Sequence, residues 1–116
     1  HNLTDTENLN VVAFEKETMD KLGLIPEIAP RYRATYFSHI IGGYAAGYYS
    51  YLWAEVLDTD AFEAFKEHGV FDKNTADSFR KNILEKGGTE DPMTLYRGFR
   101  GADPSLEPLL KNRGLK

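Results

Sequence analysis

The stretch Ala45–His68, A-A-G-Y-Y-S-Y-L-W-A-E-V-L-D-T-D-A-F-E-A-F-K-E-H, holds the longest helical pattern in the chain. Phe62 and Phe65 continue its apolar surface beyond an expected bend at residues 58–60, and Gly69 is the expected C-terminal stop. Its main apolar stripe recurs at the three- and four-residue spacing of one helix face. The stripe consists of Tyr49, Leu52, Trp53, Val56 and Leu57. The pattern predicts one long helix that packs this stripe into a core.

Helical signals occur on both sides of this helix. Upstream, Thr4 and Glu7 have the spacing of a capping box and Gly23 is a plausible stop, so a helix is expected over about residues 5–22. Residues 24–30 hold two prolines and are expected to form a connecting segment. Residues 31–41 are ambiguous and fit a short helix that ends in an extended stretch.

Three shorter helices are expected downstream. Asp72 or Asn74 can cap the first, which ends at the glycine pair 87–88. The second starts at Asp91-Pro92 and stops at Gly101, and the third runs over about residues 103–112. The sequence therefore predicts an all-α chain of about five helices with short connections, forming over residues 1–116 a single helical domain or a fragment of one.

Composition excludes several classes of partner. The net charge is −4 without a long run of one sign, which argues against nucleic acid and against an anionic membrane surface. The chain has no cysteine, so disulfide scaffolds and cysteine-based zinc sites are excluded. No apolar run approaches the roughly 18–20 residues that cross a bilayer.

The stretch from His39 to Glu55 carries the candidate chemistry. Gly42 and Gly43 lie between a histidine and a group of tyrosines, and a helix that starts near residue 44 would place four side chains on one face. These four are Tyr44, Tyr48, Tyr51 and Glu55. Neutral phenol hydroxyls can donate hydrogen bonds to peptide carbonyl groups, or to the oxyanion that forms when water attacks one. A mobile Gly-Gly loop would let these groups close over a bound peptide.

A structural interpretation of the same residues stands beside this one. Tyrosine-rich stripes more often pack a core edge or a subunit interface, because the ring is apolar and its tip tolerates water. The glycine pair can be an ordinary turn, and a lone His39 beside isoleucines is more often structural than catalytic. Arg97 and Arg100 can bind a carboxylate, but pairing with a surface Asp or Glu is the commoner role.

The chain offers no complete metal site of its own. Its histidines are His1, His39 and His68, and no two are four residues apart, so no His-Glu-x-x-His helix is present. A catalytic zinc site needs about three protein ligands, and Lys66-Glu67-His68 supplies only two. We therefore expect the chain by itself to bind no metal.

The block from His39 to Asp58, H-I-I-G-G-Y-A-A-G-Y-Y-S-Y-L-W-A-E-V-L-D, resembles the C-terminal part of the thimet-oligopeptidase-like zinc metallopeptidases, and within them the bacterial peptidyl-dipeptidases and oligopeptidases A. The resemblance continues upstream through Pro30-Arg31-Tyr32-Arg33. Downstream it continues through residues 87–91, residues 99–101 and the closing Arg113-Gly114-Leu115. It covers most of the chain from about residue 30 onward.

This resemblance implies a role for each residue of the block. Tyr51 would be the principal donor to the oxyanion, and His39 would donate a hydrogen bond to the substrate. Tyr44 would be a mobile contact beside the loop of Gly42 and Gly43, and Tyr48 a further residue of the cleft. The zinc ion and its ligands would belong to the full-length parent, so this segment alone is expected to be inactive.

The resemblance also implies a parent enzyme that hydrolyses short peptides, with a peptidyl-dipeptidase preferred over an internally cutting oligopeptidase. The expected compartment is the cytoplasm, with the periplasm as the alternative. The other function left open is a non-catalytic helical module that binds peptides or another subunit through its tyrosine face. We also expect the isolated chain to self-associate through apolar surface that its missing neighbours would cover.

Overall fold

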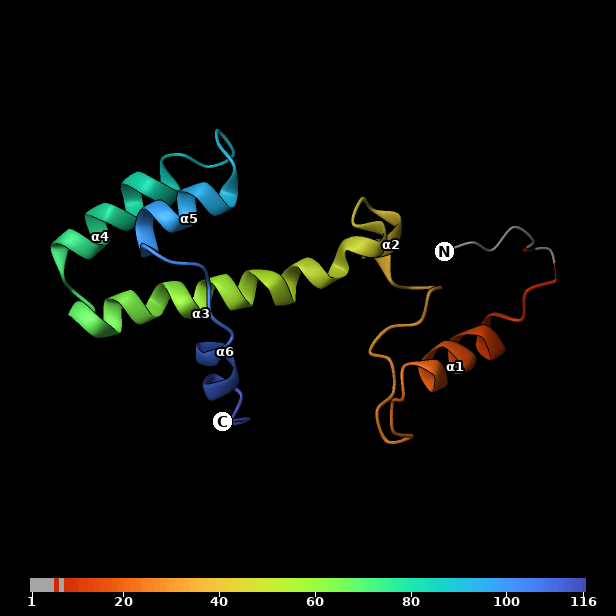
Figure 1. The fold of residues 1–116 in the computed structure, drawn as a ribbon. Coiled ribbons are helices and arrows are strands. Elements are labelled where there is room, and N and C mark those ends of the chain that lie inside the picture. The colour runs from red at the N-terminus through yellow and green to blue at the C-terminus, as the bar shows by residue number, and fades with distance from the viewer. Residues whose placement is uncertain (1–5, 7) are drawn as a thin grey trace. The chain divides into compact units, whose positions relative to one another are not determined.

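The computed structural model describes residue 6 and residues 8–116, and this part of the chain is helical without a β-strand. The α-helices are α1 Val11–Lys21, α2 Ser38–Ile41, α3 Ser50–His68, α4 Lys73–Phe79, α5 Pro92–Arg100 and α6 Glu107–Asn112 (Figure 1). A 3-10 turn at Ala45–Tyr49 leads into α3, and a π-helical turn at Arg80–Leu84 extends α4. The all-α prediction is confirmed, and the short helix α2 is the element beyond the five expected. None of the helices described is long and apolar enough to cross a membrane.

The chain divides into two compact units, residues 1–38 and residues 39–116. In the first, Asn10 caps α1 by accepting a backbone hydrogen bond at 3.0 Å, and Gly23 follows the helix at φ +71°. The predicted start at residue 5 is therefore wrong, because the cap lies at Asn10. The capping box of Thr4 and Glu7 lies outside the described residues. No side chain of α1 is buried.

Local capping signals set the helix ends of the second unit. Gly69, at φ +113°, ends α3, and Gly101, at φ +76°, ends α5. The carboxylate of Asp72 accepts a backbone N–H at 2.8 Å to start α4, and Asp91 does the same at 2.9 Å for α5, with Pro92 at the first helical position. These predicted boundaries are confirmed. The final helix is shorter than the predicted range of about residues 103–112, since α6 begins only at Glu107 and ends at Asn112.

Helix α3 is unbroken from Ser50 to His68, so no interruption of the helix occurs at residues 58–60. The hydroxyl of Thr59 donates to the backbone carbonyls of Glu55 at 2.7 Å and Val56 at 3.1 Å. The threonine therefore turns its polar atom back onto its own helix, and the helical hydrogen-bond ladder runs on to His68.

The core of the second unit lies where α5 and α6 pack on α3. Its buried apolar residues are Val56, Ala61, Ala64, Leu95, Tyr96 and Leu109. Phe65, Phe79 and Phe99 join α4 and α5 to this core, with ring centroids 5.1–6.3 Å apart. The predicted core stripe of α3 is only partly buried: Val56 is enclosed, but Tyr49, Leu52 and Trp53 are exposed.

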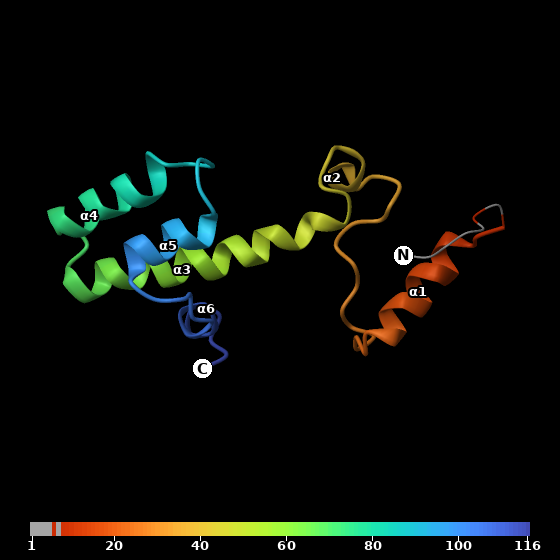
Figure 2. The same ribbon diagram turned by 45° about the horizontal axis from the view of Figure 1, so that its top comes forward.

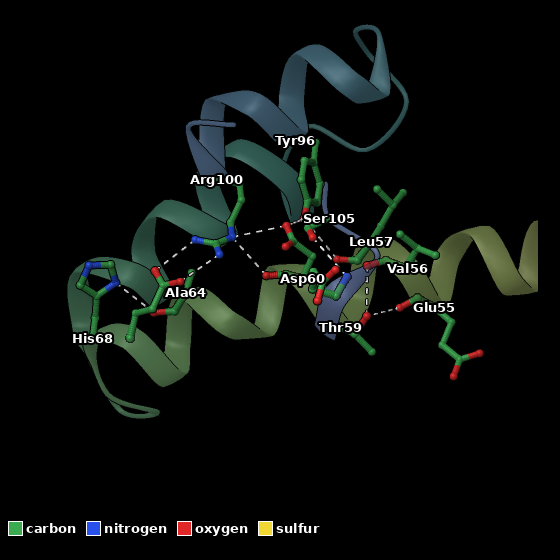
Figure 3. Close-up of polar contacts among 12 residues, drawn as sticks. Glu55, Val56, Leu57, Thr59, Asp60, Ala64, His68, Tyr96, Arg100 and Ser105 are labelled. Atoms are coloured by element: carbon green, nitrogen blue, oxygen red, sulfur yellow. Dashed lines mark hydrogen bonds and ion pairs between the residues drawn. The ribbon is translucent and has the colours of Figure 1, made fainter. Parts of the chain in front are cut away.

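A buried polar contact fixes α5 against α3 (Figure 3). Asp60 is 5% exposed and accepts a hydrogen bond from the hydroxyl of Tyr96 at 2.5 Å. The Nε atom of Arg100 lies 3.4 Å from the same carboxylate and donates to the backbone carbonyl of Asp60 at 3.1 Å. Arg100 also makes two hydrogen bonds to Glu67, so one guanidinium joins two turns of α3.

Candidate functional site

Four aromatic side chains converge where α2, the 3-10 turn and the start of α3 meet. These are His39, Tyr44, Tyr48 and Tyr51, which we call the tyrosine cluster. The imidazole centroid of His39 lies 5.1–5.9 Å from each phenol ring, in edge-to-face orientations. The rings of Tyr48 and Tyr51 meet at 5.2 Å. The structure thus brings the three tyrosines predicted on one helix face together with His39.

Tyr44 and Tyr51 form the closest pair of the cluster. Their rings are stacked with centroids 5.5 Å apart and an interplanar angle of 15°. The hydroxyl of Tyr51 donates a hydrogen bond to the hydroxyl of Tyr44 at 3.1 Å. This hydrogen bond, with some desolvation, raises the pKa of Tyr51 above its ordinary value, so its phenol remains a neutral donor through the physiological range.

The backbone between α2 and α3 makes this arrangement. Gly42 and Gly43 form a turn after α2, and Gly43 adopts φ +114°, where an L side chain would be strained. The N–H of Tyr44 then donates to the carbonyl of His39 at 3.1 Å, which folds Tyr44 back over α2. Ala45 also has a positive φ of +47°, the left-handed conformation that costs a non-glycine residue energy.

The cluster combines two solvent-accessible phenol hydroxyls with the half-buried imidazole of His39. Tyr44 is 44% exposed and Tyr51 is 50% exposed, so both can meet a ligand. Tyr48 and His39 are half-buried among them. Such a surface presents several neutral hydrogen-bond donors on aromatic rings, which suits a peptide backbone more than a charged group.

Glu55, predicted on the same face, is engaged elsewhere. Its carboxylate accepts two hydrogen bonds from Arg113, at 2.5 Å and 3.3 Å, and this ties the end of α6 to α3 one turn beyond Tyr51. No local sequence pattern predicts this contact, because Glu55 and Arg113 are 58 positions apart.

The two arginines of α5 are paired within the chain. Arg97 donates to Asp103 at 2.6 Å, and Arg100 binds Glu67 and Asp60. The interpretation of these residues as ion-pair partners of Asp and Glu is therefore confirmed. Both ion pairs raise the pKa of their guanidinium groups, through hydrogen bonds to Asp103 and to Glu67 respectively.

Among the described residues, no group of three or more His, Asp or Glu side chains is placed to hold a metal ion. His68, for example, directs its Nδ1 atom to the backbone carbonyl of Ala64 at 2.9 Å. The donors present in this part of the chain therefore do not fit a catalytic zinc site.

Comparison with known proteins identifies the family to which this sequence is similar. The family model described as Peptidase family M3 matches residues 1–115. Oligopeptidase A of Escherichia coli is 57% identical over 81 residues, which are 69% of this chain and 12% of that protein. Dipeptidyl carboxypeptidase of Escherichia coli is 43% identical over 114 residues, which are 97% of this chain and 16% of that protein.

A more distant relative is the thimet-like oligopeptidase of Dictyostelium discoideum. It is 38% identical over 79 residues, which are 68% of this chain and 12% of that protein. The chain thus spans less than a fifth of the length of these relatives. The match nevertheless extends over nearly all of its own residues, and the chain belongs to peptidase family M3.

Proposed function

We propose that this chain is the C-terminal substrate-binding part of a zinc-dependent oligopeptidase. The observation that carries the proposal is the tyrosine cluster, in which the Tyr51 ring contacts three further aromatic side chains and its hydroxyl donates a hydrogen bond to Tyr44. Relatives whose names describe them as peptidases, together with the family match, support a peptide as the ligand.

Within this proposal Tyr51 acts on the transition state. Its neutral hydroxyl donates to the oxyanion that forms as the scissile carbonyl becomes tetrahedral. In the structure that hydroxyl donates to Tyr44 instead, so a bound substrate would take over a donor that is already oriented. His39, Tyr44 and Tyr48 would bind the peptide around it, and the turn of Gly42 and Gly43 would let Tyr44 adjust its position.

We further propose that the parent releases dipeptides from peptide C-termini. The support is the extent of the match: it covers 97% of this chain with dipeptidyl carboxypeptidase, against 69% with oligopeptidase A. The zinc ion would be held by residues of the parent outside this chain and would supply the activated water. The 116-residue chain alone would then bind peptide weakly and cleave none.

The test is Tyr51→Phe in the full-length parent, assayed on a short peptide with a free C-terminus. Removal of one oxyanion donor should lower kcat by about 10²-fold, with a much smaller change in KM, because the hydrogen bond strengthens in the transition state. The matched control is Tyr49→Phe, since it removes the same hydroxyl from a neighbouring tyrosine that lies outside the cluster. Equal kcat values for the two variants would defeat the assignment. A parent that binds peptides without cleaving them would favour the non-catalytic binding module.

A further inference from the structure

An ion pair lies one helical turn beyond Tyr51. The guanidinium group of Arg113 donates two hydrogen bonds to the carboxylate of Glu55, at 2.5 Å and 3.3 Å. Both residues belong to the unit of residues 39–116, as does the whole tyrosine cluster. Tyr51 and Glu55 are four residues apart on α3, so their side chains leave one face of the helix about 6 Å apart along its axis. The ion pair therefore follows the cluster directly on that face.

The ion pair joins α3 to α6. Figure 1 and Figure 2 both show α6 beside α3, and the two helices pack against each other. Arg113 comes directly after the last residue of α6, and Leu109 of the same helix is buried. Arg113 thus extends from a packed helix, which lowers the conformational entropy that is lost when its side chain pairs with Glu55.

The start of α3 has little support of its own. Among the described residues, Tyr49 at the N-cap position makes no capping hydrogen bond through its side chain, and the first backbone N–H groups of an α-helix have no partner within the helix. The described side-chain and backbone contacts from α3 to the later helices involve Glu55, Leu57, Asp60 and Glu67. Of these, Glu55 is nearest to Tyr51, which lies in the first turn. The ion pair is therefore placed to hold that turn still.

We infer that Glu55 and Arg113 are positioning residues, whose ion pair holds the first turn of α3 so that the Tyr51 hydroxyl keeps its orientation toward the oxyanion. The inference rests on the proposed function of Tyr51. A hydrogen-bond donor stabilises an oxyanion only within a narrow range of positions. Motion of the turn that carries Tyr51 would therefore lower the rate of the chemical step more than the affinity for the peptide.

Hydrogen exchange of the 116-residue chain tests whether the ion pair anchors the turn. The backbone N–H groups of Trp53 and Ala54 pair with carbonyl groups four residues earlier, so their exchange reports on opening of the first turn. Glu55→Gln keeps the shape of the side chain and removes its charge. Exchange at these two amides should become about three- to fivefold faster, which is the effect expected of an exposed but two-pronged ion pair, while exchange at Ala64 stays unchanged.

Two variants complete this experiment. Arg113→Gln should reproduce the effect of Glu55→Gln, because it removes the other partner. Glu107→Gln is the matched control, since it breaks the ion pair of α6 with Lys116 and leaves α3 untouched. Unchanged exchange in Glu55→Gln would overturn the inference. Equal acceleration at Ala54 and Ala64 would also overturn it, because the pair would then stabilise the whole unit and not the turn that carries Tyr51.

Kinetics of the full-length parent test the positioning role. Glu55→Gln should lower kcat about three- to fivefold with little change in KM, and should lower it no further in the Tyr51→Phe background. Glu107→Gln should keep the unaltered kcat. An equal loss in the Tyr51→Phe background would overturn the inference, because the ion pair would then act on another group. Full activity of Glu55→Gln beside an impaired Tyr51→Phe would overturn the inference and leave the proposed function standing. Full activity of Tyr51→Phe would defeat the proposed function itself.

Discussion

The hydrogen bond between Tyr96 and Asp60 should be a main determinant of the stability of the second unit. Tyr96→Phe removes only the hydroxyl, which lies 2.5 Å from the Asp60 carboxylate, and keeps the ring that packs between α5 and α3. Burial, followed by this hydrogen bond, raises the pKa of Tyr96 above its ordinary range, so the phenol is a neutral donor at any working pH. Asp60 retains Arg100, whose Nε atom is 3.4 Å away.

The expected cost follows from the kind of bond that is lost. A hydrogen bond to a charged, buried acceptor contributes about 1.5–3 kcal/mol, and partial compensation by Arg100 places the loss near 2 kcal/mol. The assay is urea unfolding of the 116-residue chain, followed by far-UV circular dichroism. Tyr49→Phe is the control, because its hydroxyl is on an exposed side chain and its removal should change the free energy of unfolding by less than about 0.5 kcal/mol. Equal unfolding midpoints for the two variants would refute the reasoning.

Three further outcomes are expected. In Tyr44→Phe the pKa of Tyr51 should fall toward its ordinary value, because the hydrogen bond from Tyr51 to Tyr44 is the largest cause of its elevation. Carbon-13 NMR of labelled tyrosine measures this pKa, and an unchanged value would contradict the pairing of the two residues. The backbone N–H of Thr94 donates a hydrogen bond to the Asp91 carboxylate and lowers its pKa, so the contribution of Asp91 to helix stability is present above about pH 4 and is lost as pH falls through the lowered pKa. Asp91→Asn, which caps without ionising, should therefore flatten the acid loss of the circular dichroism signal below about pH 4. Gly69→Ala, at φ +113°, should destabilise the chain by about 1–3 kcal/mol, whereas Gly88→Ala, at an ordinary φ and with open space around it, should be close to neutral in the same urea assay.

The helix boundaries that the sequence predicted correctly depend on neighbouring residues. Asp72 and Asp91 cap their helices by reaching a backbone N–H three residues ahead, and Gly69 and Gly101 end helices through their own backbone conformation. The start of α1 was missed because a second cap, Asn10, lies inside the predicted helix. Signals of this kind are local, so they can be read from a short window but can compete with one another.

Burial was predicted less well, because it depends on partners far away in the sequence. The spacing of Tyr49, Leu52 and Trp53 correctly indicates an apolar face, yet none of the three is among the buried residues within the unit of residues 39–116. The contacts of Asp60 with Tyr96 and of Glu55 with Arg113 join residues 36 and 58 positions apart. No local pattern specifies either pair.

The tyrosine cluster lies between these two cases. Tyr48 and Tyr51 are one turn apart, so their proximity follows from helical spacing. Tyr44 joins them through a different route, since a 3-10 turn and the left-handed Ala45 separate it from α3 and its ring stacks on Tyr51 from outside the helix. His39 completes the group through the turn of the two glycines. Helical spacing thus grouped the three tyrosines, and the turn geometry determines how they face one another and how His39 joins them.

The central claim is that this chain completes the substrate site of a zinc peptidase whose metal ligands lie elsewhere in the same polypeptide. The most direct measurement is the sequence of the coding DNA immediately upstream of residue 1. We predict an open frame that encodes a His-Glu-x-x-His motif, followed by a helix that bears another glutamate, because that ligand set holds catalytic zinc. A start codon close to residue 1, or an upstream frame without those ligands, would contradict the account and favour a helical peptide-binding module.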